Sequence, residues 1–164
     1  MGGGAWPAAG PMNAAVQMRP ARADDLDAIH AIEVASFSDP WKRDGFRDLI
    51  LGGNATVVVA ALGQEVVGFA VTYAAADEAE IANVAVADSV RRRGIGRALV
   101  DFVLSTMIAG GARNVFLEVR ESNVAARALY TARGFSELSR RPAYYRNPRE
   151  DAVVMRLAVP DALA

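Results

Sequence analysis

A short run rich in arginine and glycine is the strongest chemical signal in the sequence. It spans Arg91 to Arg97, reads RRRGIGR, and lies between a predicted strand and a predicted helix. Glycines let the backbone approach a ligand closely, and a helix start offers unpaired amides at the positive end of its dipole. With its arginines, the loop suits a pyrophosphate group. A solvated turn with surface arginines explains the spacing equally well.

The loop differs from two common phosphate-binding motifs. The dinucleotide fingerprint G-x-G-x-x-G requires a glycine where Leu99 stands. A Walker loop requires Lys and Ser or Thr directly after its last glycine, and Arg97 follows Gly96 here. Neither a Rossmann nor a P-loop enzyme is indicated.

Residue types limit the chemistry further. The sequence has no cysteine, which excludes disulfides, thiolate nucleophiles, iron–sulfur clusters and cysteine zinc sites. Its only histidine is His30, so multi-histidine metal sites are excluded, and no metal is expected. A Ser/His/Asp triad is possible only through His30. Carboxylates, tyrosines, backbone amides and arginines remain to do the chemistry.

Length and charge predict a single domain with no strong overall electrostatic field. The chain has 164 residues, 52% of them hydrophobic, which predicts a single domain with a real core. Its formal net charge of −1 gives no general attraction to nucleic acid or to a membrane. No run of apolar residues is long enough for a transmembrane helix. We therefore expect a cytoplasmic protein.

The first residues differ in composition from the rest. Met1 to Ala15 is rich in Gly, Ala and Pro and lacks the basic start of a signal peptide. We expect residues 1–17 to be a disordered leader or an expression remnant, with Met12 or Met18 as possible true starts. The domain is expected over residues 18–160.

Hydrophobic periodicity predicts an α/β (α+β) mixed sheet rather than a doubly wound fold. Asp24 is expected to cap the first helix, Asp39-Pro40 to open the second, and Gly63-Gln64 to form a hairpin turn. The expected helices cover residues 26–35, 40–51, 94–109 and 123–133. The expected strands cover residues 16–22, 56–62, 65–73, 80–86, 115–119, 135–138 and 153–159.

Two motifs make the sequence resemble the GNAT family of N-acetyltransferases over residues 18–160. The first is the sequence VAV followed, five residues later, by RRGIGR, in which the family pattern Q/R-x-x-G-x-G/A is matched by Arg91, Gly94 and Gly96. The second runs from Asn123 to Phe135 with the form N-x-x-A-x-x-L-Y-x-x-x-G-F. The resemblance implies a mostly antiparallel central sheet flanked by helices, and acetyl-CoA as cosubstrate.

Three further signatures resemble the family branch that acetylates the N-terminal alanine of a small-subunit ribosomal protein. They are F-x-x-P-W-x-x-x-x-F from Phe37, L-E-V-R-x-S-N from Leu117, and Y-Y followed by R-E-D-A-V-x-M from Tyr144. Lys42 stands where that branch often has Ser or Thr. The resemblance therefore implies a protein N-terminus as acceptor, attacked directly in a ternary complex.

The resemblance also assigns roles. Glu118 is the implied general base and Tyr130 the implied general acid. Asn123 would contact acetyl-CoA and cap its helix. Weaker substrate-binding candidates are Trp41, Tyr144 and Tyr145. The remaining implied acetyl-CoA contacts are Val84, Ala85 and Val86, through their backbones, and Arg91, Arg92, Arg93, Gly94, Ile95, Gly96 and Arg97.

Each role has a structural alternative. Glu118 could be a surface carboxylate paired with Arg120 or Arg113, and Tyr130 could be a core aromatic beside Phe135. Tyr144, Tyr145 and Trp41 could simply pack. Five acidic residues could make the acceptor entrance negative, although Asp77 and Glu121 more readily suit a solvated surface; the set is Asp77, Glu78, Glu80, Glu118 and Glu121.

Other functions stay open from the sequence. The same chemistry could act on other protein N-termini, on lysine or on a small amine. A non-catalytic acetyl-CoA-binding module is a second possibility, which the presence of both Glu118 and Tyr130 disfavours. The sequence does not fix the oligomeric state; a monomer is plausible.

Overall fold

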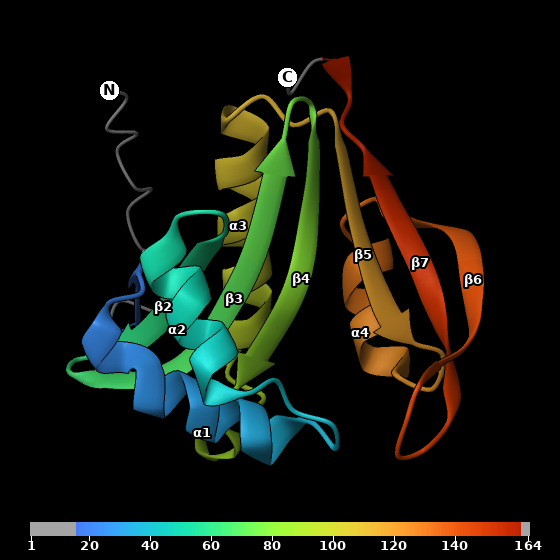
Figure 1. Ribbon diagram of the computed structural model, residues 1–164. Helices are drawn as coiled ribbons and strands as arrows, with labels where there is room; N and C mark the ends of the chain where they lie inside the picture. Colours follow the sequence, from blue (N-terminus) through green and yellow to red (C-terminus); the bar gives the residue numbers. More distant parts are fainter. Residues whose placement is uncertain (1–15, 162–164) are drawn as a thin grey trace.

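A computed structural model describes residues 16–161 (Figure 1). The element order matches the order expected from the sequence. The helices are α1 (Leu26–Ser36), α2 (Arg43–Gly52), α3 (Ile95–Ala109) and α4 (Val124–Thr131). The strands are β1 (Val16–Pro20), β2 (Thr56–Leu62), β3 (Glu65–Ala75), β4 (Glu78–Val86), β5 (Asn114–Arg120), β6 (Ser136–Tyr145) and β7 (Glu150–Ala158).

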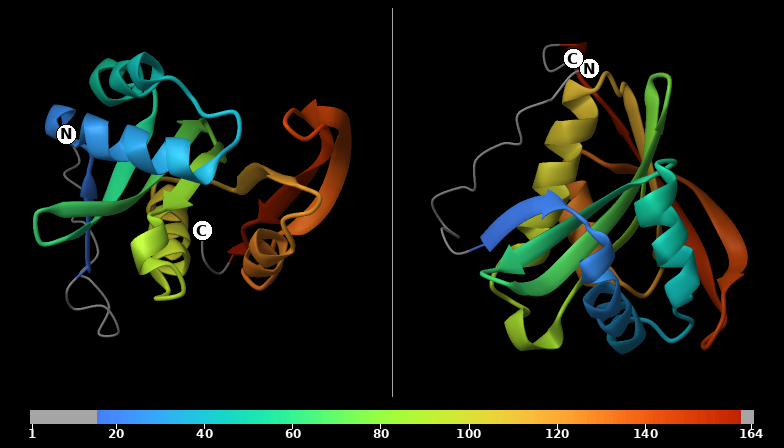
Figure 2. Two further views of the ribbon diagram at one scale, coloured as in Figure 1. Left: turned by 90° about the horizontal axis from the view of Figure 1, so that it is seen from below. Right: turned by 60° about the vertical axis from the view of Figure 1, so that its left-hand side comes forward.

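The seven strands form one sheet in the order β1-β2-β3-β4-β5-β7-β6. Every neighbouring pair is antiparallel except β4 and β5, which are parallel. Helices α1 and α2 cover one face of the sheet, and α3 and α4 cover the other (Figures 1 and 2). The expected mixed sheet, mostly antiparallel and flanked by helices, is confirmed.

Each face of the sheet has its own core. Leu99 and Val100 of α3 are fully buried against the sheet, as is Val153 of β7. On the other face, Ile29 of α1 and Phe46 of α2 are fully buried. The predicted apolar stripe of α3 is confirmed, because Ile95, Leu99, Phe102, Val103 and Met107 are all buried.

The parallel pair β4–β5 is short. Its register runs from Glu78 opposite Asn114 to Ile81 opposite Leu117 and then stops, although both strands continue. On its other side, β4 shifts register against β3 next to Thr72. Such an irregularity bends and twists a strand. The two halves of the sheet therefore separate beyond Ile81 and Leu117, as Figure 1 shows.

The expected hairpin and helix end are also confirmed. Leu62 pairs with Glu65 across the Gly63-Gln64 turn. Gly53 follows α2 with a left-handed φ of 73°, the conformation that glycine tolerates best after a helix.

Two predicted helix starts are wrong. Helix α2 begins at Arg43, not at Pro40, because the backbone amide of Trp41 donates to the Glu33 carboxylate at 3.0 Å and stays outside the helix. The turn before α1 is organised by Asp25 rather than Asp24. The Asp25 carboxylate accepts the Arg22 amide at 2.7 Å and pairs with Arg19 at 2.6 Å.

The limits of two strands also differ from expectation. Strand β1 begins at Val16, two residues before the predicted domain start, and residues 1–15 of the predicted leader lie outside the described residues. Strand β6 extends to Tyr145, well past the predicted end at residue 138.

Among the helices of residues 16–161, none has the length and apolar character needed to cross a bilayer.

The contact between β3 and α3 generates a stability prediction. A Cβ added at Gly68 would lie 3.0 Å from Leu99 Cδ1 and 3.1 Å from the Ala85 carbonyl oxygen. We expect Gly68→Ala to lower the free energy of unfolding by about 1–3 kcal/mol through overpacking. Urea denaturation measures this. Gly52→Ala is the control, because nothing lies within 4 Å of its added Cβ; equal stability of the two variants would contradict the prediction.

Candidate active site

The arginine–glycine loop joins β4 to α3 in a conformation that exposes backbone amides. Gly94 precedes α3 with φ of 79°, and Arg92 has φ of 64°. No side chain caps α3, and its first helical hydrogen bond runs from the Ala98 amide to the Gly94 carbonyl at 3.0 Å. The amides before Ala98 are therefore available to an anion at the positive end of a helix of 15 residues.

A cavity of about 610 Å³ lies between this loop and α4. Most of the predicted cofactor residues line it, together with the small side chains of Ala125 and Ala128 and the Arg133 side chain from α4. The predicted residues on its wall are Val86, Arg91, Arg92, Gly94, Ile95, Gly96 and Arg97.

Four predicted cofactor residues are not on this wall. The side chain of Val84 packs against the core under α3, and that of Ala85 lies in the core under α1 and α2. Arg93 is exposed. Asn123 caps α4 as expected, since its side chain accepts the Ala126 amide at 3.1 Å.

Tyr130 is buried at the end of α4. Only 8% of it is exposed, and its ring lies 5.6 Å from that of Phe135 in an edge-to-face arrangement. Burial raises its pKa to about 12. The phenol therefore stays protonated through neutral pH. The core packing that we considered as an alternative is present, and it keeps the phenol protonated.

Glu118 has a partner that the sequence did not reveal. Its carboxylate lies 3.0 Å from Nε of Arg141 on β6. It also accepts a hydrogen bond from Tyr144, which raises the pKa of that phenol. The expected alternative partners are wrong: Arg120 pairs with Glu150 at 3.2 Å, and Arg113 pairs with Asp161 at 3.0 Å.

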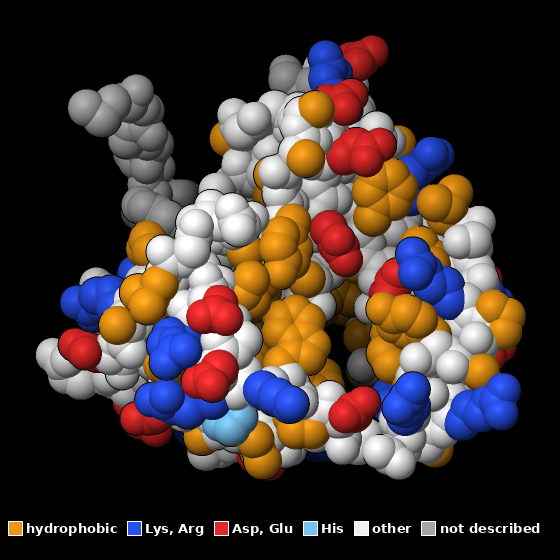
Figure 3. All heavy atoms as spheres, viewed as in Figure 1, with side chains coloured by type: hydrophobic (Ala, Val, Ile, Leu, Met, Phe, Trp, Pro, Cys, Tyr) orange, Lys and Arg blue, Asp and Glu red, His pale blue; other side chains and the backbone are white. Residues whose placement is uncertain are grey.

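A second cavity, of about 500 Å³, opens beside Glu118 on the face that carries α1 and α2. Side chains from both halves of the sheet line it, including Tyr73 of β3, Glu80 of β4 and Arg141 of β6. Figure 3 shows this face, with hydrophobic side chains along the middle, acidic ones among them, and a hollow between the two halves.

The loop before α2 is held in place by a buried carboxylate. Glu33 is 1% exposed and accepts hydrogen bonds from the Trp41 amide at 3.0 Å and from Asn83 Nδ2 of β4 at 2.8 Å. Burial raises its pKa. Trp41 itself packs on Phe46, with ring centroids 5.5 Å apart, and is 37% exposed. Sequence reasoning missed Glu33.

The two predicted tyrosines lie beside Glu118. The rings of Tyr144 and Tyr145 meet edge to face with centroids 5.1 Å apart. Tyr144 is 49% exposed, whereas Arg120 stacks 4.5 Å from the Tyr145 ring centre. Burial, followed by the negative charge of Glu118, raises the pKa of Tyr145 to about 12.

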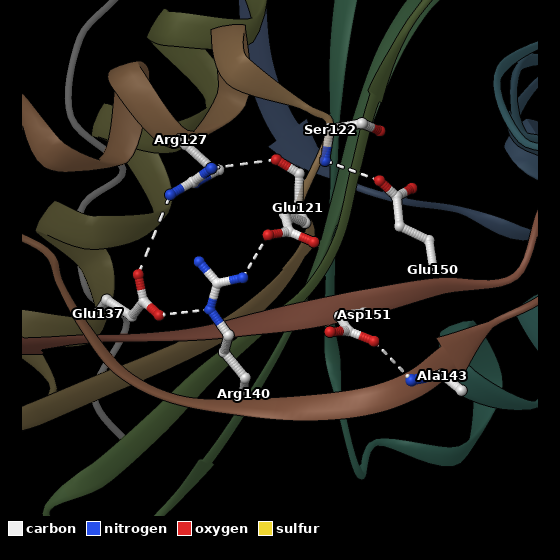
Figure 4. A network of polar contacts seen from close by, with 8 residues as sticks. All are labelled: Glu121, Ser122, Arg127, Glu137, Arg140, Ala143, Glu150 and Asp151. Atoms are coloured by element: carbon white, nitrogen blue, oxygen red, sulfur yellow. Dashed lines mark hydrogen bonds and ion pairs between the residues drawn. The ribbon is translucent and has the colours of Figure 1, made fainter.

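Ion pairs tie β6 to α4 and to the end of β5 (Figure 4). Arg140 bridges Glu137 and Glu121, and Arg127 donates to the Glu121 carbonyl at 3.0 Å. Glu150 accepts the Ser122 amide at 2.7 Å. The elements that carry Tyr130, Glu118 and Arg141 are thereby held as one unit.

A comparison with models of protein families shows to which family the chain belongs. Residues 26–135 match the model described as the acetyltransferase (GNAT) family. The chain belongs to the GNAT acetyltransferase family. It is therefore an N-acetyltransferase, and enzymes of this family use acetyl-CoA.

Individual relatives agree. The chain is 35% identical over 137 residues to the ribosomal protein bS18-alanine N-acetyltransferase of Escherichia coli K12, covering 82% of this chain and 92% of that one. The crystal structure of the corresponding E. coli enzyme aligns with a TM-score of 0.81 at 33% identity, and the alignment covers 87% of this chain and 92% of the E. coli chain. The structure of Ard1 from Thermoplasma volcanium aligns with a TM-score of 0.81 at 29% identity, and the alignment covers 90% of this chain and 99% of the Ard1 chain.

The first cavity of this GNAT enzyme fits the pyrophosphate of acetyl-CoA. The unpaired amides at the start of α3 and the arginines around them would supply hydrogen bonds and positive charge to it. Within residues 16–161, no group of three or more His, Asp or Glu side chains is placed to hold a metal ion.

We predict that the arginines on the cavity wall govern affinity for coenzyme A. The double change Arg92→Ala and Arg97→Ala should weaken binding by about tenfold or more, since hydrogen bonds to charged groups contribute about 1.5–3 kcal/mol. Isothermal titration calorimetry measures this. Arg146→Ala, on the hairpin between β6 and β7, is the control, and unchanged affinity of the double variant would refute the phosphate assignment.

Proposed function

We propose that the enzyme transfers the acetyl group of acetyl-CoA to the N-terminal α-amine of a protein, and that its acceptor is the N-terminal alanine of a ribosomal protein. The relative at 35% identity is named for this reaction on ribosomal protein bS18. Such an acceptor would place the enzyme in the cytoplasm. We also propose that residues 16–160 form the catalytic domain, while the leader stays a prediction.

One observation carries the proposal. Glu118 lies on the wall of the second cavity, while the strand next to it leads into the phosphate-binding loop at the first cavity. Direct transfer needs a base for the acceptor amine and a cosubstrate held next to it, and these two cavities offer a carboxylate for the first and an anion site for the second. The unpaired edge of β4 after Ile81 lies between them and offers backbone groups to an extended ligand.

The α-amine is the acceptor that this site can most easily deprotonate. An amine must be neutral to attack a thioester, and an α-amine has a pKa near 8, against about 10.4 for lysine. At 1.36 kcal/mol per unit, deprotonation at pH 7 costs about 1.4 kcal/mol for the α-amine and about 4.6 kcal/mol for lysine. A single carboxylate base suffices for the first.

We assign the two proton transfers of the reaction to Glu118 and Tyr130. Glu118 takes a proton from the acceptor nitrogen, directly or through a water, and the nitrogen lone pair attacks the thioester carbon. The carbon–sulfur bond then breaks, and Tyr130 donates a hydrogen bond and its proton to the leaving sulfur. We assign Tyr144, Tyr145 and Trp41 to the acceptor slot, because both tyrosines lie beside Glu118 and Trp41 is partly exposed.

Acceptor choice is tested with two peptides and acetyl-CoA. One begins with a free alanine and has the sequence of a ribosomal protein N-terminus without lysine; the other is N-terminally blocked and carries one lysine. Mass spectrometry should show one added acetyl group on the first peptide only. Acetylation of the blocked peptide alone would contradict the α-amine assignment.

The proton transfers are tested with two isosteric variants. Glu118→Gln and Tyr130→Phe should each lower kcat by about 100-fold, the lower range for general acid–base catalysis. The KM for acetyl-CoA should change little, because neither side chain lines the phosphate cavity. Steady-state kinetics with the alanine peptide measures both constants. Full turnover in both variants would exclude this mechanism.

A further inference from the structure

A buried carboxylate of α1 holds the loop before α2, which comprises residues 37–42. Glu33 is 1% exposed, and each of its carboxylate oxygens accepts one hydrogen bond. Oε1 accepts the Trp41 amide of the loop at 3.0 Å, and Oε2 accepts Asn83 Nδ2 of β4 at 2.8 Å. The carboxylate therefore joins α1, the loop and β4, and the proposed proton transfers do not use it.

An apolar side chain at residue 33 would suit the core better than a carboxylate. Leu26, Ile29 and Ile32 form the rest of the buried face of α1. Within residues 16–161, no Lys or Arg side chain pairs with Glu33, and burial raises its pKa. A buried carboxylate without a cationic partner is costly, and an apolar replacement often stabilises a fold. What the carboxylate adds is two acceptor atoms for donors on two different elements.

One of these donors is fixed by the sheet. The pairing of β4 with β5 ends at Ile81, whereas β4 stays paired with β3, where Asn83 lies opposite Val71. The β3–β4 ladder therefore holds the backbone of Asn83 in place. Asn83 thus gives Glu33 a rigid partner on the stretch of β4 that no longer pairs with β5.

The loop that carries the other donor has little further support. Within residues 16–161, the bond from the Trp41 amide to Glu33 is the only hydrogen bond or ion pair made by residues 38–41. The Trp41 ring packs on Phe46, whose ring meets the buried Phe69 of β3 edge to face, with centroids 5.4 Å apart. One backbone hydrogen bond and one ring contact therefore determine where this part of the loop lies.

The loop borders the opening between the two halves of the sheet. In Figures 1 and 2 it lies on the side of α1 and α2 that faces the half formed by β5, β7 and β6. Trp41, which we assign to the acceptor slot, is 37% exposed there. A shift of the loop would move a wall of this slot and leave the β3–β4 ladder and the first cavity in place.

We propose that Glu33 is a positioning residue of the acceptor slot, which sets the Trp41 loop against β4 and so determines how tightly an acceptor chain binds. The proposal rests on the proposed function. Glu33 acts through the Trp41 amide and does not touch the reacting atoms. Because that amide is an uncharged donor, the role requires a hydrogen-bond acceptor at residue 33 rather than a negative charge.

The test is steady-state kinetics with the alanine peptide at saturating acetyl-CoA. Glu33→Met keeps a long unbranched side chain without oxygen acceptors, and should raise the KM for the peptide by about tenfold or more, because a displaced wall weakens acceptor binding. The kcat should change by less than about threefold, as expected when binding alone is lost. Coenzyme A affinity, measured by calorimetry, should stay unchanged, because no residue of the loop lines the first cavity.

Two further variants separate this role from a merely structural one. Glu33→Gln keeps an acceptor for the Trp41 amide, and its own amide can donate to the Asn83 carbonyl once that side chain turns over. This variant should therefore have a peptide KM close to that of the unmodified enzyme. Ile32→Val is the control, because it loosens the packing of the same helix and removes neither hydrogen bond; its peptide KM should not change.

Hydrogen exchange in the unmodified enzyme tests the link to the loop without any variant. After correction for intrinsic rates, the Trp41 amide should exchange about tenfold or more slowly relative to the amides of Ser38 and Asp39. Those two amides donate no hydrogen bond within the part of the chain that the structure describes. Equal exchange at the three amides, measured by NMR, overturns the proposal whether or not Glu33→Met folds.

The outcomes distinguish the two proposals. If Glu33→Met and Ile32→Val have the same peptide KM, the role of Glu33 is overturned while α-amine acetylation stands. A raised KM in Glu33→Met with an equal loss of coenzyme A affinity, or a KM raised as much in Glu33→Gln, also overturns it. If the unmodified enzyme acetylates no α-amine, the proposed function fails and the acceptor role of Glu33 fails with it.

Discussion

The site depends on the point at which β4 and β5 stop pairing. Beyond Ile81 and Leu117 the two strands continue without bonding to each other. Buried backbone groups that lack a partner are costly, so a sheet that opens in its middle needs a ligand or water to pair with them. We propose that an extended cosubstrate arm and an acceptor chain meet this need, so that both reactants reach the centre of the fold through the opening.

In the mechanism that we propose, different parts of the chemistry lie on different halves of the sheet. The half ending in β4 leads into the Arg91–Arg97 loop, to which we assign phosphate binding, and includes the Glu33 carboxylate that holds the loop before α2. The half beginning with β5 carries Glu118, Tyr130 and, on β6, Arg141. Packing against the buried face of α3 stabilises the half that ends in β4, and the ion pairs in Figure 4 stabilise the half that begins with β5. Catalysis as we propose it requires both halves.

Local signals in the sequence were sufficient for most of the fold. Alternation predicted the strands, Gly63-Gln64 predicted the hairpin, and the apolar stripe of α3 predicted its buried face. The end of β6 was missed because Pro142 and a left-handed Ala143 interrupt its pattern. The start of α2 was missed because a buried carboxylate eight residues away determines it.

Features of the candidate site were predictable where they depend on residues close in sequence. Most of the loop from Arg91 to Arg97 lines the first cavity, and Asn123 caps α4 as its local motif predicted, while the contacts of both with acetyl-CoA stay predictions. The pairing of Glu118 with Arg141 joins two strands whose contact depends on the whole sheet order. Nothing in local spacing distinguishes Arg141 from the arginines beside it.

The central claim is that one acceptor chain and one cosubstrate occupy the opening together, on either side of the end of the β4–β5 pairing. Backbone amide chemical shifts, recorded with a conjugate of coenzyme A and an alanine-initiated peptide, test it directly. We expect changes at the amides that begin α3 and at those around Glu118 and Tyr144 in the same titration. Changes confined to only one of these regions would contradict it.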